Sequence, residues 1–145
     1  MTRSLSAELM PPVFTGQDLL EDLGWLAGDM KEKFGLSVRL HQKTKQVEAS
    51  DSVREFLIRA VRELLFNVIR HAKTKMADVT VKRDDADWIM VQVKDNGKGI
   101  AEDSASGHGL GLAKLRERVN YFGGQLRVES SPGKGTCVTL VISAK

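Results

Sequence analysis

The chain has 145 residues, of which 41% are hydrophobic and 28% are charged, and these values fit one globular domain with a core of its own. A net charge of +3 is compatible with nucleic-acid binding, but the Lys and Arg residues are dispersed among acids without a basic stripe, so we expect no nucleic-acid partner. Because no apolar run approaches the roughly 20 residues of a membrane span, no signal-peptide pattern follows Met1, and a single cysteine allows no internal disulfide, we expect a soluble, cytoplasmic protein.

The N-terminal part is expected to hold one amphipathic helix. Residues 1–14 include two adjacent prolines, which cannot continue a helix, and we expect this segment to be the end of something upstream. Thr15 can cap a helix with Asp18 at the third position, and apolar residues then recur at helical spacing as far as Phe34. Gly35 is expected to end this helix.

A strand, its hairpin partner and a second helix are expected next. Residues 36–40 alternate between apolar and polar side chains, as a half-buried strand does, and residues 44–49 are expected to pair with them as a hairpin. Ser52 and Glu55 have the spacing of a capping box for a helix that runs to about Ala72.

One face of this second helix carries a stripe of polar side chains. At about 100° per residue, Glu63, Asn67, Arg70 and His71 share one arc of the helix about 100° wide. An ordinary solvated face stabilised by i,i+4 pairs produces the same pattern, so the spacing alone leaves both interpretations open.

The second half of the chain is expected to complete a sheet. In chain order the pattern predicts a strand over 77–82, a turn over 84–87, a strand over 88–94, a polar lid over 101–106, a helix over 112–122 that Gly123 ends, and strands over 125–128 and 136–142. The predicted fold is an α+β two-layer sandwich, in which about three helices pack on one face of a mixed, mostly antiparallel five-stranded sheet.

Two glycine-rich runs indicate a nucleotide pocket. They are Asp95-Asn96-Gly97-Lys98-Gly99-Ile100 and Gly107-His108-Gly109-Leu110-Gly111-Leu112. A carboxylate at the end of an apolar strand can accept hydrogen bonds from an exocyclic amine, and glycines let the backbone come close to a flat ring. Backbone N–H groups at a glycine-rich helix start bind phosphate. Together these features predict ATP binding.

Two better-known phosphate motifs are excluded. The dinucleotide fingerprint fails on spacing, because Leu112 follows Gly107 and Gly109 where glycine or alanine is required. The Walker A loop fails because Gly135 separates Lys134 from Thr136, and the segment leads into a strand and not a helix.

Four pieces in fixed order carry a family resemblance: Glu63 to Asn67, Asp95-x-Gly97-x-Gly99, Gly107-x-Gly109-x-Gly111, and Gly135-Thr136. This order resembles the Bergerat-type ATP-binding domain shared by gyrase, a class of heat-shock chaperones, sensor histidine kinases and MutL proteins. Residues 62–72 and 115–119 look like the nitrate-sensor-like group of sensor histidine kinases. The resemblance covers residues from about 16 to 145.

The resemblance implies how the base would be held. Asp95 would receive the adenine amine with Thr136 supporting it, and Gly97 and Gly99 would allow the base to enter. The same run places Asn96 and Ile100 at the nucleotide.

The resemblance also implies how the phosphates would be held. Asn67 would bind Mg²⁺ carried by the phosphates, and Arg70 and His71 would lie along the phosphate side. The run from Gly107 to Leu112, with His108, Gly109, Leu110 and Gly111, would form the lid hinge and the helix start. Glu63 matches the position that activates water in the hydrolytic relatives, whereas its part in kinases is less settled.

The phosphoacceptor histidine of the family is not found in this chain. In the family it sits on an upstream dimerisation helix beside an acidic residue, and none of His41, His71 and His108 has that setting. Residues 5–13 resemble the join just after that helical hairpin. We therefore expect residues 1–14 to be the remnant of the upstream linker and residues 15–145 to be the catalytic domain.

The expected function follows from this resemblance. The chain would be the catalytic domain of a sensor histidine kinase, which binds Mg-ATP and donates the γ-phosphoryl to a histidine on an upstream dimerisation domain, with a response regulator acting downstream. Alone it would be a monomer without membrane contact and inactive in autophosphorylation. A self-contained ATPase of the gyrase or MutL type and an anti-sigma-like serine kinase are the alternatives.

Overall fold

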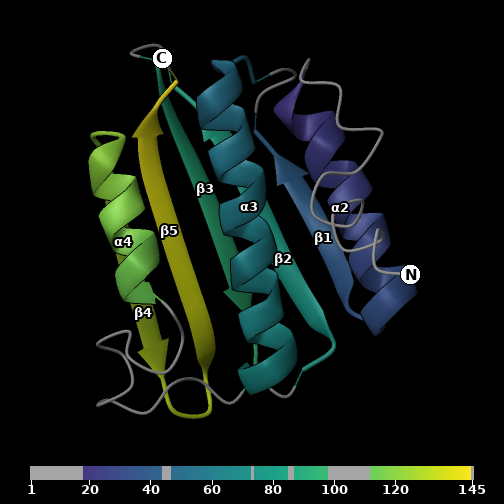
Figure 1. Cartoon of the computed structure of the whole chain (residues 1–145). Helices are drawn as coiled ribbons and strands as arrows, with labels where there is room; N and C mark the ends of the chain where they lie inside the picture. Colours follow the sequence, from purple (N-terminus) through teal and green to yellow (C-terminus); the bar gives the residue numbers. More distant parts are fainter. Residues whose placement is uncertain (1–17, 44–46, 73, 85–86, 98–111, 145) are drawn as a thin grey trace, which may run out of the picture.

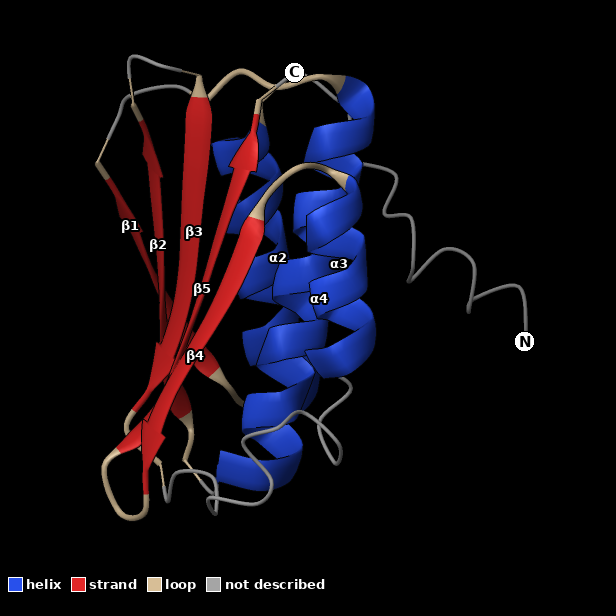
Figure 2. Ribbon diagram, turned by 90° about the vertical axis from the view of Figure 1, so that its left-hand side faces the viewer, coloured by secondary structure: helices blue, strands red, loops and turns tan. Residues whose placement is uncertain are grey.

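Three helices lie against one face of a five-stranded sheet (Figures 1 and 2). The computed structural model describes residues 18–43, 47–72, 74–84, 87–97 and 112–144. In chain order the elements are α2 (Leu19–Phe34), β1 (Ser37–Gln42), α3 (Asp51–Asn67), the π-helical turn η1 (Val68–Ala72), β2 (Met76–Arg83), β3 (Trp88–Asp95), α4 (Leu112–Tyr121), β4 (Gln125–Ser131) and β5 (Gly135–Ser143). The predicted two-layer α+β fold is confirmed. No helix in these ranges is long and apolar enough to cross a membrane.

The sheet is mixed, with the strand order β1-β2-β3-β5-β4. β1 runs parallel to β2, from Ser37 opposite Met76 to Gln42 opposite Val81, and the other three pairs are antiparallel. The predicted hairpin between residues 36–40 and 44–49 is wrong, because β1 pairs with β2 and residues 47–50 belong to no strand. Residues 44–46 lie outside the described part. A parallel pair needs a crossover, and α3 supplies it between β1 and β2.

The starts of the first two helices differ from the predicted ones, whereas α4 begins at residue 112 as predicted and the helix ends agree. Asp18 caps α2 by accepting from the backbone N–H of Leu20 at 3.3 Å, and Thr15 lies outside the described residues. Ser50, and not Ser52, caps α3, because its side chain accepts from the N–H of Val53 at 3.3 Å. Gly35 (φ 72°) and Gly123 (φ 76°) take the left-handed conformation that ends α2 and α4, as predicted.

The core lies between the helices and the sheet, with α3 over the middle strands (Figure 1). Its most deeply buried side chains come from every layer: Leu19, Met30, Leu36, Leu57, Leu65, Ile89, Leu112, Leu140 and Ile142. The alternation in β2 and β3 buries one face of each strand and leaves the other face toward solvent. This packing holds the C-terminal end of α3 beside the end of β3.

A buried ion pair joins α2 to α3. The Nε of Arg54 lies 3.7 Å from Oδ2 of Asp22, and both side chains are almost completely buried. Arg54 also donates to Oδ1 of the exposed Asp51 at 3.0 Å. Burial raises the pKa of Asp22 from 3.8 to about 6, against the opposing effect of the Arg54 charge. This environment therefore favours the protonated form of Asp22 more than water does.

Replacing Arg54 should expose the cost of this buried carboxylate. Arg54→Met should lower the free energy of unfolding by about 3–5 kcal/mol near pH 8, because the Asp22 charge would lose its partner. The pKa of Asp22 in the folded protein lies above its unfolded value, so the folded state binds this proton more tightly and stability is gained as pH falls from about 6 toward 3.8. The loss should therefore shrink near pH 5.

Urea unfolding of the wild type and of Arg54→Met at pH 8 and at pH 5 measures this pH-dependent loss of stability. Asp51→Asn is the matched control, since it removes the exposed partner of the same arginine and should change stability by less than about 1 kcal/mol. An Arg54→Met loss of equal size at both pH values would contradict the assignment to Asp22.

Candidate functional site

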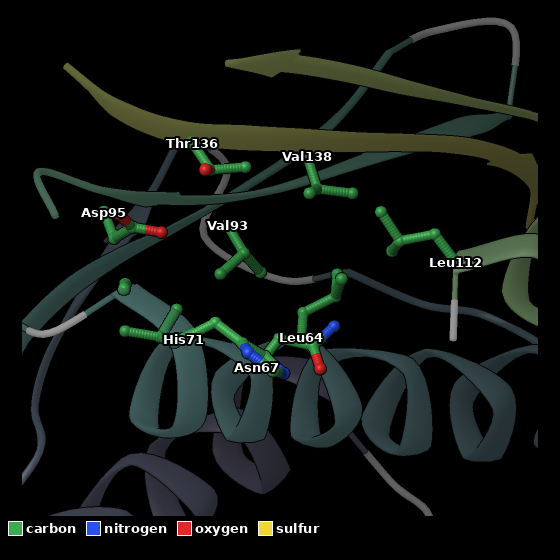
Figure 3. A pocket seen from close by; sticks show the side chains of 10 residues that line it. Leu64, Asn67, His71, Val93, Asp95, Leu112, Thr136 and Val138 are labelled. Atoms are coloured by element: carbon green, nitrogen blue, oxygen red, sulfur yellow. The ribbon is translucent and has the colours of Figure 1, made fainter. Parts of the chain in front are cut away.

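A cavity opens between the C-terminal end of α3 and the neighbouring ends of β3 and β5 (Figure 3). Its volume is about 420 Å³, including the space at its open mouth. The lining residues are Leu64, Asn67, Val68, His71, Ala72, Val93, Asp95, Leu112, Thr136 and Val138. An apolar cavity with a few convergent polar groups is typical of a small-molecule site.

Asp95 is the buried charge of this cavity. It is the last residue of β3, lies opposite Thr136 on β5, and is only 5% exposed as a residue. Its Oδ1 accepts from the backbone N–H of Gly97 at 2.8 Å. Burial raises the pKa of Asp95, and the backbone hydrogen bonds from Gly97 and Thr136 oppose that rise. Among the described residues no Lys or Arg forms an ion pair with this carboxylate.

Two glycines allow the backbone around Asp95 to pack closely. A Cβ atom at Gly97 would collide with the carbonyl oxygen of Ala72, at the end of η1. A Cβ atom at Gly135 would collide with the carbonyl oxygen of Asp95, and Gly135 also has a φ of 86° that disfavours other residues. Gly97 is thus required by its contact with protein backbone, a reason that the sequence pattern did not indicate.

The predicted polar stripe on α3 divides into two parts. Asn67 and His71 line the cavity, whereas Arg70 and Glu63 do not, and both of these side chains are about half exposed. Arg70 connects the two parts, because its Nη2 donates to Oδ1 of Asn67 at 3.0 Å and lies 3.7 Å from Oε2 of Glu63. The π-helical turn carries both Arg70 and His71, a feature often found at functional sites.

The structure brings five of the predicted residues together around one space. Figure 3 shows Asp95 and Thr136 on the sheet side, Asn67 and His71 on the helix side, and Leu112 at the start of α4. Asn96 is exposed and does not line the cavity. The predictions for Gly99, Ile100, Gly107, His108, Gly109, Leu110 and Gly111 fall outside the described residues.

The apolar walls of the cavity were not predicted as part of the site. Leu64, Val68 and Ala72 come from the helical side, and the cross-strand partners Val93 and Val138 come from the sheet. Sequence periodicity assigned such residues to the core. Val93 lies two residues before Asp95 and Val138 two residues after Thr136, so the two-residue period of a strand was the signal that could have placed each valine on the same face as its polar neighbour.

The described residues offer few oxygen ligands for a metal. No group of three or more His, Cys, Asp or Glu side chains in those ranges is arranged to hold an ion. The carboxamide oxygen of Asn67, which is 8% exposed as a residue, is the polar oxygen on the helix side of the cavity. A metal here would have to bring most of its ligands with it, as Mg²⁺ does when it is bound to phosphates and water.

Known sensor histidine kinases are similar to this chain over nearly its whole length. It is 29% identical to the oxygen sensor histidine kinase NreB of Staphylococcus carnosus, over 97% of this chain and 40% of that protein. It is 30% identical to the sensor histidine kinase LiaS of Bacillus subtilis, over 97% of this chain and 38% of that protein. The chain thus spans about 40% of the length of the curated relatives it matches.

A solved structure shares the fold. The histidine kinase domain of a blue-light activated histidine kinase from Erythrobacter litoralis superimposes with a TM-score of 0.70 and 26% identity, over 88% of this chain and 61% of that one. The family model described as histidine kinase-, DNA gyrase B- and HSP90-like ATPase matches residues 52–145, which include all of α3 but its first residue, the residues that line the cavity, and every strand but β1. The chain therefore belongs to the histidine kinase-, DNA gyrase B- and HSP90-like ATPase family.

Proposed function

We propose that this chain is the ATP-binding catalytic domain of a sensor histidine kinase and that ATP binds in the Asp95 cavity. The observation that carries the proposal is a buried carboxylate, without a cationic partner in the described residues, inside an apolar cavity at the end of α3. The family membership and the named relatives support the same function.

The cavity suits an adenine ring. A carboxylate has more acceptor sites than the backbone hydrogen bonds from Gly97 and Thr136 occupy, so Asp95 can also accept from an exocyclic amine. Val93, Val138 and Leu112 provide apolar walls for a flat ring (Figure 3). Guanine would present a carbonyl oxygen to the same carboxylate, and that pair of acceptors repels.

The polar end of α3 suits the phosphates. His71 and Asn67 line the cavity there, and Arg70 lies beside Asn67. A carboxamide oxygen accepts more than one bond, so donation from Arg70 is compatible with Asn67 as one ligand of Mg²⁺. The ion would neutralise the charge of the phosphate oxygens during transfer.

The domain would act by positioning and charge neutralisation. In the proposed reaction a ring nitrogen of a histidine on an upstream dimerisation domain attacks the γ-phosphorus, the bond to the bridging oxygen breaks, and ADP leaves as the ring loses its proton. A response regulator would receive the phosphoryl group in turn. We place this chemistry in the cytoplasm, where ATP is available.

Removing the Asp95 carboxylate should weaken nucleotide binding without unfolding the domain. A hydrogen bond to a charged group contributes roughly 1.5–3 kcal/mol, so Asp95→Ala should weaken ATP and ADP binding by about 10- to 150-fold. Because burial raises the pKa of Asp95, wild-type affinity should also fall as pH falls through that raised value, and the variant should lack this dependence. Calorimetry measures both effects, with GTP as the control ligand. Equal affinity for GTP and ATP would exclude adenine recognition by Asp95.

Replacing Asn67 should separate metal binding from base binding. Asn67→Ala should remove most of the Mg²⁺ dependence of ATP binding and leave adenosine binding unchanged, because the base lies at the sheet side of the cavity. Titrations with and without Mg²⁺ measure the dependence. An equal Mg²⁺ effect in wild type and variant would show that Asn67 is not a ligand.

Phosphoryl transfer should need a second domain. Transfer requires the nucleophile within about 3–3.5 Å of the γ-phosphorus and in line with it, so this chain with radiolabelled ATP should form no phosphohistidine and release phosphate slowly. A dimerisation domain added in trans should be labelled at a rate set by its concentration. Acid-labile label on His41, His71 or His108 would contradict the proposal. Rapid phosphate release would favour a self-contained ATPase.

A further inference from the structure

Glu63, the residue whose role the family resemblance leaves unsettled, faces a guanidinium and lies outside the cavity. Its Oε2 lies 3.7 Å from Nη2 of Arg70, and its side chain is 50% exposed. A general base has to reach a water molecule at the γ-phosphate, which calls for a position at the cavity. Glu63 instead faces Arg70, whose guanidinium donates to Asn67 at the cavity.

Arg70 is held from three sides. Its Nη2 donates to Oδ1 of Asn67 on the cavity side, and the Glu63 carboxylate lies on the solvent side. The third contact is with Phe66, whose ring centroid lies 5.9 Å from Cζ of Arg70, within the range of a cation–π contact. Helical side chains lean toward the N-terminus, which explains how Arg70 reaches back to a residue two turns earlier.

The Phe66 ring is itself in contact with two other side chains. The Phe34 ring packs edge-on against it at 5.2 Å between centroids, and Cζ of Arg62 lies 4.8 Å from its centroid. These contacts pack the Phe66 ring on two sides, whereas Arg70 is 52% exposed and has room to turn toward another anion. An anion that enters beside Asn67 would meet a guanidinium already engaged with a carboxylate.

We infer that Glu63 regulates nucleotide affinity through Arg70: its carboxylate competes with the nucleotide phosphates for the Arg70 guanidinium and weakens their binding. The inference rests on the proposed function, since it needs phosphates at the Asn67 end of the cavity. Glu63 is thus a positioning residue that acts through Arg70. The competition affects nucleotides that carry β- and γ-phosphates and spares adenosine, which has none.

Removing the Glu63 charge should strengthen binding of ATP. Half-exposed ion pairs are weak, so Glu63→Gln should tighten ATP binding by about 1.5- to 5-fold in calorimetry at low salt and leave adenosine affinity unchanged. Glu55→Gln is the matched control, because it makes the same change about two turns earlier on α3, away from the cavity, and should change neither affinity.

A double-mutant cycle tests whether Glu63 acts on ATP affinity through Arg70. In an Arg70→Met background, which should itself bind ATP more weakly, Glu63→Gln should produce no gain. A gain that persists in that background would overturn the inference, since it would reflect general charge and not competition for Arg70. Unchanged ATP affinity in Glu63→Gln together with lost phosphate release would also overturn it, in favour of a base. If wild type binds adenosine but not ATP, phosphate binding at Asn67 fails and this inference with it, whereas failure to bind either ligand refutes the proposed function itself.

Discussion

The burial of one carboxylate constrains the structure around the site. Asp95 ends β3 inside an apolar cavity, where its charge is costly unless hydrogen bonds compensate it. The compensation comes from the backbone N–H groups of Gly97 and Thr136, and neither can reach it unless β5 and the segment after β3 pass very close. The absence of side chains at Gly97 and Gly135 makes that approach possible. These two glycines are therefore required by the packing of the backbone around Asp95, independently of any ligand.

The same packing sets the position of the helix that faces Asp95. Gly97 approaches the carbonyl oxygen of Ala72, which is the last residue of η1, so the turn after β3 and the end of the long helix are in contact. That contact holds Asn67 and His71 across the cavity from the sheet (Figure 3). At the other end, Ser50 caps the first turn of α3, and the buried Asp22–Arg54 pair holds that start against α2. The site thus depends on how α3 is fixed at both ends.

Much of the fold could be predicted from patterns that are local in sequence. The 3.6-residue and two-residue periodicities identified the helices and the five strands, because each element must bury one face. The glycine stops at Gly35 and Gly123 were predicted for the conformational reason that the structure shows. The starts of α2 and α3 were less accurate, because several polar residues near each start can act as caps, and the choice depends on which backbone N–H the side chain reaches. The parallel pairing of β1 was missed because strand partners are distant in sequence.

The sequence by itself determined that a carboxylate would end a strand before two glycine-rich runs, and that polar side chains would line one face of the second helix. The order of these patterns indicated the ATPase family that the comparisons confirm. The roles assigned to the individual residues stay predictions. Only the tertiary structure decided which members of the stripe face the cavity, since a π-helical turn changes the angular spacing of Arg70 and His71 and a uniform helical projection assumes one angle throughout. It also decided that Glu63 faces Arg70 and that Val93 and Val138 form walls beside Asp95, because these contacts depend on side-chain reach and strand register, which are settled only when the elements pack.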